Sequence, residues 1–361
     1  MPTPPCILTI AGSDSGGGAG IQADLKTITV IGGFGMSVIT ALTAQNGVGV
    51  AGIHAPEPGF VGLQLKTVRE GFPIAAAKTG MLFSAEIIEA VEAGLQGREF
   101  PLVVDPVCVS QSGQRLLRED AVNALRWHIL PKADLLTPNR PEAELLADMK
   151  IDSEKDIDVA ARKLLDMGPK AVLIKGGHFG SASDAEFTDW LALPDEPLIA
   201  LKQPGVKTSN NHGTGCTLSA AIATYLGLGL GIRDAIVHAQ KFLNHCLRHG
   251  YAPGLGARRT TLHGLPSGLA NSFSGGKKRT SARRCARNAG SRFFFFPPCR
   301  LSRFLGRFGF RHTGVLSPEG TPPCLPCQYV LSFFIMMPSA LYPRWLQCGL
   351  SSAERTWISL L

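Results

Sequence analysis

The stretch AGSDSGGGAGIQADLKT, residues 11–27, links an apolar run to an amphipathic run through a loop rich in glycine. Residues 7–11 are short and apolar, as a buried strand requires, and residues 21–31 carry apolar side chains at helical spacing. A strand, a glycine loop and a helix in direct succession are typical of α/β proteins. The glycines at positions 16, 17, 18 and 20 favour a hinge in this loop, or a backbone that approaches a ligand closely.

The same alternation of strand and helix patterns continues along the chain. Further short apolar runs predict strands at residues 36–40, 75–78, 102–105, 135–137 and 171–175. Amphipathic stretches predict helices at residues 85–94, 121–129, 142–147, 157–168, 217–226 and 233–249. Such alternation predicts an α/β fold with a parallel sheet covered on both faces, and the nearly continuous apolar character of the strands agrees with burial on two sides.

Residue types that carry chemistry follow these strands where each strand ends. In open α/β sheets, ligands bind at this carboxyl edge. One polar residue at a strand end is ordinary for a solvated loop, whereas two lysines, two acids and an amide at successive ends favour a shared site. The residues at these ends are Gly12, Lys78, Met81, Asp105, Asn139, Glu142 and Lys175.

The glycine loop carries neither of two common nucleotide-binding motifs. The glycine loop does not match G-x-G-x-x-G in register, and no G-x-x-x-x-G-K-[ST] occurs, so neither a dinucleotide fingerprint nor a P-loop is expected. Two polar residues near the loop are candidate ligand contacts. Asp24 lies one helical turn after Gly20, and the amide of Gln45 can both donate to and accept from an aminopyrimidine-like edge.

A second glycine turn, in NNHGTGCTLSAA at residues 210–221, leads into an apolar helix. Gly213 and Gly215 allow positive φ or a close approach of the backbone. The unpaired N–H groups of a helix start bind anions, and the helix dipole lowers the pKa of a thiol such as Cys216. The turn therefore predicts an anion site with a reactive cysteine. The alternative is a tight turn into a core helix that buries an unreactive cysteine.

The net charge of +8 is unevenly distributed. Residues 265–361 contain 13 Lys and Arg but only 2 Asp and Glu, which leaves the rest of the chain at −3. The basic balance therefore does not predict a nucleic-acid surface on the main body. Cys6, Cys108, Cys216 and Cys246 are widely spaced there, which predicts reduced thiols and a cytoplasmic location. A signal peptide and a membrane span are not expected, because the apolar runs are too short.

The composition changes abruptly from about residue 266. Blocks of basic residues, four consecutive phenylalanines at residues 293–296 and no period predict a disordered or non-native extension, including a frameshifted or read-through translation. CLPC at residues 324–327 resembles half of a redox or metal site but has no partner motif. The weaker alternatives for the tail are RNA binding and a membrane span.

Seven segments in order carry a family resemblance across about residues 5–257: AGSDSGGGAGIQADLKT, VITALTAQN, KTGML, DPV, TPNRPEAELL, KGGH and NNHGTGCTLSAAIA. They resemble hydroxymethylpyrimidine/phosphomethylpyrimidine kinases, thiamine-pathway enzymes of the ribokinase-like superfamily. The resemblance implies a three-layer αβα fold with a mostly parallel sheet. It also implies phosphorylation of 4-amino-5-hydroxymethyl-2-methylpyrimidine, and then of its monophosphate, by ATP and Mg²⁺.

The resemblance also implies roles for individual residues and a homodimer with small-molecule partners. The pyrimidine site would comprise Gly12, Asp24, Gln45 and Met81. Asp105, Asn139 and Lys175 would bind ATP and its phosphates, and Glu142 would hold Mg²⁺ through water. Gly213, Thr214 and Gly215 would form an anion hole before Cys216, the expected catalytic base.

Two alternatives stay open beside this interpretation. Pyridoxal kinases share the scaffold and the glycine-cysteine ending, so pyridoxal is a second candidate substrate. A non-catalytic pyrimidine-binding module is the third possibility.

The sequence departs from the family pattern in several places. Asn211 stands where Thr is usual, Cys108 where Met is common and Thr43 where some members have Val. The ending GLGARRTTLHG only loosely matches the usual Gly-His-Gly-Pro segment. None of these changes removes a needed chemical group. The expected organisation is therefore a kinase domain at residues 1–260 followed by the tail at residues 261–361.

Overall fold

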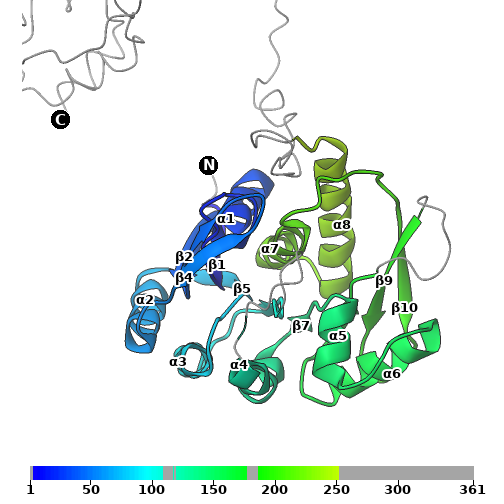
Figure 1. Cartoon of the computed structure of the whole chain (residues 1–361), viewed down its shortest axis with the longest axis horizontal. Helices are drawn as coiled ribbons and strands as arrows, with labels where there is room; N and C mark the ends of the chain where they lie inside the picture. Colours follow the sequence, from blue (N-terminus) through cyan, green and yellow to red (C-terminus); the bar gives the residue numbers. More distant parts are fainter. Residues whose placement is uncertain (1–2, 109–116, 118, 177–185, 252–361) are drawn as a thin grey trace, which may run out of the picture. The chain divides into compact units, whose positions relative to one another are not determined.

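A central sheet flanked by helices on both faces forms the body of the protein (Figure 1). The computed structural model describes residues 3–108, 117, 119–176 and 186–251. Within these residues the sheet has eight strands in the order β10-β9-β8-β7-β6-β5-β1-β2. The predicted tail at residues 261–361, with its CLPC motif, lies outside the described residues, so the proposed domain boundary stays a prediction.

Six neighbouring strands of this sheet run parallel, as the alternation of patterns predicts. They are β1 (Cys6–Ala11), β2 (Phe34–Ile39), β5 (Ile74–Thr79), β6 (Leu102–Val104), β7 (Leu135–Leu136) and β8 (Val172–Ile174). Each corresponds to a strand predicted from the sequence. The side chains of β1, β6, β7 and β8 are all buried because helices cover both faces, whereas the edge strand β2 is only partly buried and its Phe34 is exposed.

Helices divide between the two faces of the sheet, as the two core clusters show. Ile7 of β1 packs with α1 (Gly20–Ile31), α7 (Thr214–Gly227) and α8 (Ile232–Arg248). The next residue, Leu8, points to the opposite face. That face is covered by α2 (Pro58–Gly71), α3 (Ala85–Gly94), α4 (Glu119–Ala124), α5 (Arg140–Ala147) and α6 (Glu154–Leu165). A π turn (Leu125–Ile129) and a 3₁₀ turn (Leu130–Lys132) continue α4. The αβα layering is therefore confirmed.

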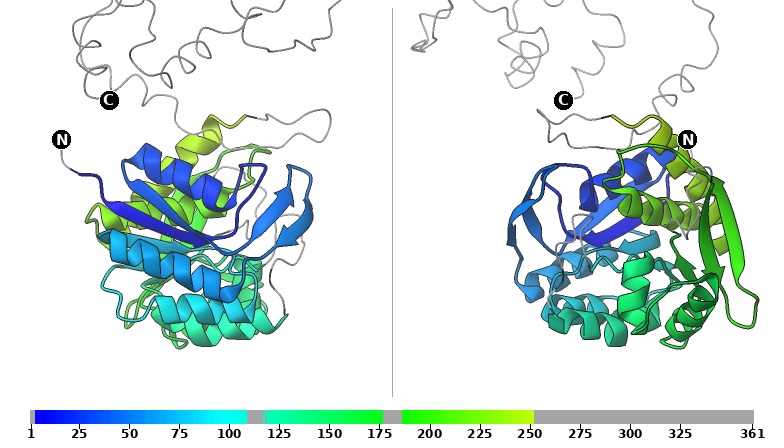
Figure 2. Two further views of the ribbon diagram at one scale, coloured as in Figure 1. Left: turned by 90° about the vertical axis from the view of Figure 1, so that its left-hand side faces the viewer. Right: turned by 45° about the vertical axis from the view of Figure 1, so that its right-hand side comes forward.

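Two pairs of strands and one helix escaped the sequence analysis. β9 (Glu186–Ala192) and β10 (Ile199–Pro204) extend the sheet in antiparallel register beyond β8. β3 (Leu42–Gln45) and β4 (Val50–His54) form a separate antiparallel ribbon that projects beside the glycine loop (Figure 2). Most of their side chains are half-exposed or exposed, so neither pair shows the continuous apolar run of a central strand. Helix α2 also lacked a recognised pattern, although its Val61 and Leu65 are buried.

The body contains free thiols at Cys6, Cys108, Cys216 and Cys246, as predicted. Among the helices of the described residues, none combines the length and apolar character needed to cross a membrane.

Candidate active site

A cavity of about 400 Å³ opens at the carboxyl edge of the parallel strands. Of the residues that the sequence analysis assigned to a site, all but Asp24 line this cavity. The residues brought together are Gly12, Gln45, Met81, Asp105, Asn139, Glu142, Lys175, Gly213, Thr214, Gly215 and Cys216. They come from segments up to about two hundred positions apart, and only the parallel fold places them at one edge.

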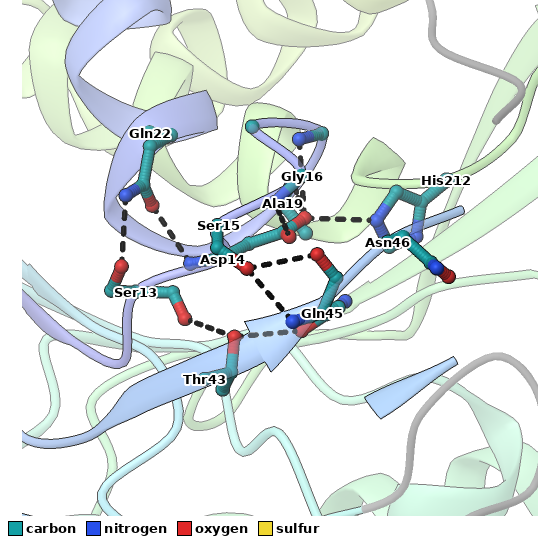
Figure 3. A network of polar contacts seen from close by, with 12 residues as sticks. Ser13, Asp14, Ser15, Gly16, Ala19, Gln22, Thr43, Gln45, Asn46 and His212 are labelled. Carbon is teal, nitrogen blue, oxygen red and sulfur yellow. Dashed lines mark hydrogen bonds and ion pairs between the residues drawn. The ribbon is translucent and has the colours of Figure 1, made fainter. Parts of the chain in front are cut away.

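Asp14 organises the glycine loop at the rim of the cavity (Figure 3). Its buried carboxylate accepts hydrogen bonds from the backbone N–H groups of Gly16 (2.8 Å), Gly18 (3.1 Å) and Ala19 (2.8 Å). The same carboxylate lies 3.1 Å from Nε2 of His212. Burial acts to raise the pKa of Asp14, but His212 and the N–H donors hold it below its ordinary value. The loop is therefore fixed to the segment before α7, and the expected hinge does not describe this arrangement.

The alternative expectation for the loop, a backbone that approaches a ligand closely, stays a prediction, but two of its glycines lie close to neighbouring protein atoms. Gly20 has a φ of 56°, and a Cβ added there would lie 2.4 Å from the carbonyl oxygen of Gly12. A Cβ on Gly12 would lie 2.4 Å from the terminal methyl of Met81. Any side chain at either position would therefore push into the cavity wall.

Gln45 stands at the end of β3, where the ribbon meets the glycine loop (Figure 3). The Ser15 hydroxyl donates to the Gln45 carbonyl and accepts from the Gln45 N–H, both at 2.8 Å. The hydroxyl of Thr43 donates to the Ser13 carbonyl at 2.8 Å and lies 3.2 Å from Oε1 of Gln45. These contacts fix the backbone of Gln45, so its amide group projects into the cavity from a rigid base.

Asp24 is the exception among the predicted site residues, because its side chain has no exposed surface. Both of its oxygens bind the ammonium of Lys78, at 2.9 and 3.0 Å, and one accepts from the Thr9 hydroxyl at 2.7 Å. Burial raises the pKa of Asp24, but this geometry is that of an ion pair. Burial acts to lower the pKa of Lys78. The negative charge of Asp24 outweighs burial and raises that pKa above its ordinary value. Asp24 therefore does not line the cavity itself, but it binds Lys78, which does.

Asp105 and Lys175 form a second ion pair, 2.8 Å long, at the ends of β6 and β8. The Ser219 hydroxyl donates to the other oxygen of Asp105 at 3.1 Å. Burial acts to raise the pKa of Asp105, but Lys175 and Lys78 hold it below the ordinary value. Lys175 also lies 4.0 Å from Glu142, so one ammonium stands between two carboxyl groups.

The predicted N-x-x-E pattern forms a capping box at the start of α5. Asn139 accepts from the N–H of Glu142 at 2.9 Å, and Oε2 of Glu142 accepts from the N–H of Asn139 at 2.8 Å. Burial raises the pKa of Glu142 to about 7, with Lys175 opposing and Asp105 assisting. The box thus fixes two site residues at once and places a carboxyl group that titrates near neutral pH in the cavity wall.

Cys216 lies in the first turn of α7, next to the predicted anion turn. Gly213 caps the helix with a φ of 84° and has no side chain to bond the N–H groups of the first turn. Residues 213–216 line the cavity, and the N–H of Thr214 donates to the Asn211 carbonyl at 3.3 Å. A helix start at the cavity wall is where an anion site is expected. The expected low pKa of Cys216 is wrong. Burial raises it to about 11, because removal from water outweighs Lys78 and the N–H of Gly20.

A second cavity, of about 470 Å³, adjoins the first. The two share Lys175, Gly176, Thr214 and Gly215 as lining residues. The rest of the second cavity is walled by β9, β10, the segment after β10, and helices α7 and α8. Its side chains include Phe187, Asp189, Gln203, Lys207, Leu218, Gln240, Leu243, Asn244 and Leu247.

The sequence analysis missed three polar residues that hold this site together: Asp14, Thr43 and Ser219. Lys78 stood in the predicted row of strand ends, but its burial with Asp24 was invisible because the partners are 54 positions apart. The S-D-S spacing before the glycines could have suggested Asp14 as an Asx-type loop residue.

Comparison with known proteins agrees with this geometry. Residues 14–261 match the family model for phosphomethylpyrimidine kinase. The chain is 47% identical over 252 residues to the hydroxymethylpyrimidine/phosphomethylpyrimidine kinase of Synechococcus elongatus, covering 70% of this chain and 95% of that protein. It is 45% identical over 251 residues to the thiamine biosynthesis bifunctional protein ThiED of Geobacter sulfurreducens, covering 69% of this chain but only 50% of that protein.

A solved relative also shares the fold. The pyridoxal kinase from Staphylococcus aureus in complex with AMP-PCP and pyridoxal aligns with a TM-score of 0.62 and 32% identity, over 70% of this chain and 91% of that chain. The family match covers more than half of the chain, and the Synechococcus kinase is matched along nearly its whole length. The chain therefore belongs to the phosphomethylpyrimidine kinase family.

Proposed function

We propose that this protein transfers a phosphoryl group from ATP to the hydroxymethyl group of 4-amino-5-hydroxymethyl-2-methylpyrimidine, and then to the resulting monophosphate. The observation that carries the proposal is the junction of the two cavities. There the anion turn before Cys216 and the ammonium of Lys175 border both spaces. A donor nucleotide in the second cavity and an alcohol in the first would meet at that junction, as in-line phosphoryl transfer requires.

The first cavity suits a small aminopyrimidine. Met81 and Gly12 supply a narrow apolar wall, and Gln45 supplies an amide from a fixed backbone. An amide can pair with the ring nitrogen and the amino group of the pyrimidine together. The predicted contact by Asp24 would act through Lys78.

The phosphates of ATP would lie at the junction. The backbone N–H groups of residues 213–216 would bind the oxygens of the transferred group, and Lys175 would neutralise charge beside them. Asp105 and Ser219 hold Lys175 and its surroundings in place. The use of ATP agrees with the AMP-PCP complex of the Staphylococcus kinase.

The donor set at the junction fits Mg²⁺ held mainly through water and phosphate. Asp105 and Glu142 offer two carboxyl groups around a single ammonium, and Mg²⁺ in kinases commonly keeps several waters with one or two carboxylates. When bound, the ion would neutralise charge on the phosphates. Glu142 is the ligand that the family resemblance implies, and contact through water would suit it, since its Oε2 already accepts the N–H of Asn139.

Cys216 would accept the proton of the substrate hydroxyl. The thiol is neutral at rest because burial raises its pKa to about 11. To act as the base the thiol would first have to lose its proton, which Lys78 and the N–H of Gly20 favour and burial opposes. The second step differs, because a phosphate monoester is ionised near neutral pH and has no proton to remove.

The test is the Cys216→Ala variant, assayed separately with the pyrimidine alcohol and with its monophosphate. ADP release with the alcohol should fall at least about 10²-fold, whereas release with the monophosphate should fall much less. Equal losses in both steps would contradict the assignment of Cys216 as a base. The unmodified protein also decides between substrates, because faster ADP release with pyridoxal than with the pyrimidine would move the assignment to pyridoxal kinase.

A third outcome separates catalysis from binding alone. A protein that binds the pyrimidine by calorimetry but releases no ADP would be the non-catalytic module. The homodimer stays a prediction from the family resemblance, and the cytoplasmic location stays a prediction from the cysteine usage.

A further inference from the structure

Three polar side chains in the second cavity form a chain of hydrogen bonds whose direction is set at one end. Gln240 donates from Nε2 to Oδ2 of Asp189 at 2.7 Å. Gln203 donates from Nε2 to Oε1 of Gln240 at 3.3 Å. We call Asp189, Gln240 and Gln203 the amide relay. All three line the second cavity.

The backbone of the sheet brings the relay together. Asp189 and Phe187 lie two positions apart in β9 and share a face, and Phe187 is the register partner of Gln203 in β10. Gln240, which is 4% exposed, reaches this face from α8. The side chains are thus placed by two paired strands and a packed helix rather than by a loop.

The backbone N–H of Gly176 fixes the first member of the relay. It donates to Oδ1 of Asp189 at 2.8 Å. A Cβ at Gly176 would lie 1.5 Å from the Thr188 carbonyl oxygen, so only glycine allows this approach. Burial raises the pKa of Asp189, but the donors on both oxygens and the nearby charge of Lys175 favour the carboxylate.

A carboxylate only accepts hydrogen bonds, and this property orients both amides. Gln240 must turn its NH₂ group toward Asp189, which leaves its oxygen facing Gln203. Gln203 must then turn its NH₂ group toward Gln240, which leaves its own oxygen for the cavity. No donor of the described residues is seen at that oxygen. The orientation of an isolated glutamine is ambiguous, but a charged end removes the ambiguity.

We propose that the amide relay makes Gln203 a specificity-determining residue that selects a purine with an amino group at position 6. The proposal rests on the proposed use of a nucleoside triphosphate. With its phosphates at the junction, the nucleotide extends its base into the second cavity, where Gln203 presents an acceptor beside an N–H donor. That pair matches the amino group and ring nitrogen of adenine and mismatches the 6-keto edge of hypoxanthine or guanine.

The experiment compares ATP with inosine triphosphate, which differs at the 6-keto group and the adjacent ring N–H and lacks the 2-amino group of GTP. With the pyrimidine as acceptor, kcat/KM for ATP should exceed that for inosine triphosphate about tenfold. Failure to release ADP from ATP would refute the proposed function. Equal kcat/KM for ATP, followed as ADP release, and for inosine triphosphate, followed as release of inosine diphosphate, would refute only the relay.

Asp189→Asn tests the direction of the relay. The asparagine keeps an oxygen for the Gly176 N–H and turns an NH₂ group toward Gln240, so both glutamines reverse and Gln203 presents a donor to position 6. The preference for ATP should fall from about tenfold to onefold or below. Glu186→Gln in the same strand is the matched control, since Glu186 is exposed and pairs with Lys202. An unchanged preference in a folded Asp189→Asn variant would overturn the proposal.

Gln203→Leu gives a second reading that does not depend on the variant at Asp189. Removal of the amide should bring the two nucleotides to similar kcat/KM through a higher KM for ATP, with kcat largely kept. A Gln203→Leu variant that still prefers ATP tenfold would also overturn the proposal.

Discussion

Two lysine–carboxylate pairs stand at the carboxyl edge of the same sheet and differ in their access to the cavity. Lys78 and Asp24 are 1% and 0% exposed, whereas Lys175 and Asp105 are 16% and 2% exposed. Each carboxylate also accepts hydroxyl hydrogen bonds, from Thr9 in the first pair and from Ser219 and, at 3.4 Å, Thr137 in the second. The two pairs therefore have the same chemistry in two environments.

The difference shows that access to the cavity, rather than residue type, distinguishes the two pairs. Lys78 and Asp24 stabilise the fold, whereas Lys175 and Asp105 can act on a bound substrate. The ammonium of Lys78 has both oxygens of Asp24 as partners and almost no contact with water, so its charge is committed to the fold. Lys175 binds one oxygen of Asp105 and lies 4.0 Å from Glu142, so it can turn toward a phosphate. Four predictions test this contrast.

Lys78→Met should have the largest effect, and it should act on stability. The variant leaves the Asp24 carboxylate buried without its cation, which costs about 3–5 kcal/mol of unfolding free energy. Urea denaturation measures the loss. The double variant Lys78→Met/Asp24→Leu should recover most of it, because an apolar pair replaces the uncompensated charge. A Lys78→Met protein as stable as the original would show that the pair is not committed to the fold.

Lys175→Met should act on turnover instead. Loss of the ammonium beside the phosphates should lower kcat/KM about 10²–10³-fold, with a smaller loss of stability than Lys78→Met because water in the cavity can reach Asp105. Steady-state ADP release and thermal denaturation together make the measurement. Lys202→Met, at an exposed pair with Glu186, is the control and should change neither quantity. If Lys175→Met destabilised as much as Lys78→Met, the contrast would fail.

The carboxyl group of Glu142, which lies beside Lys175, should make the stability of the folded protein depend on pH. Its folded pKa of about 7 lies above the ordinary 4.5, so the folded protein holds a proton that the unfolded chain releases. This stabilisation is complete below about pH 4.5 and is lost as the pH rises through 7, a change of at most about 3 kcal/mol. Urea titrations at pH 5 and pH 8 should show the loss in the original protein and a flatter profile in Glu142→Gln. If the unfolding free energy of Glu142→Gln changed between pH 5 and pH 8 as much as that of the original protein, the raised pKa of Glu142 would be contradicted.

Thr9→Val and Ser219→Ala should have the smallest effects, and these should differ in kind. Each removes one hydroxyl donor from a buried carboxylate, a bond worth about 1–2 kcal/mol. Thr9→Val should lower the unfolding free energy by that amount and leave kcat unchanged. Ser219→Ala should cost less stability but lower kcat a few-fold, because Asp105 then holds Lys175 less firmly. A loss of kcat in Thr9→Val without a loss of stability would contradict the view that the Lys78–Asp24 pair acts on stability and not on turnover.

The sequence predicted the parallel sheet well because two-sided burial leaves an unmistakable apolar pattern. All six parallel strands and seven of the helical segments coincide with predicted ones. The β3–β4 ribbon and the β9–β10 extension were missed because half-exposed strands mix apolar and polar residues without a clean period. Helix α2 was missed for a related reason, since only Val61 and Leu65 are buried along its length.

The site was predicted by residue type but not by environment. The family motifs brought eleven residues to one cavity, yet they could not distinguish Asp24, which is enclosed, from Asp105, which lines the cavity. The prediction of a low pKa for Cys216 was wrong for the same reason. The helix dipole could be inferred from the sequence, but the burial of the thiol could not. Burial arises from residues distant in sequence, and spacing alone does not reveal it.

The contact between Asp14 and His212 joins residues 198 positions apart, which matters while the chain is still being made. At about 5–20 residues per second, the glycine loop would wait about 10–40 s for its partner to be synthesised. During that interval α7 and α8 are absent, and the face of the sheet that carries Ile7 and Ala76 is covered only in part, by α1. A ribosome-bound chain would thus expose an apolar sheet face until late in synthesis, which makes it a natural client for chaperones.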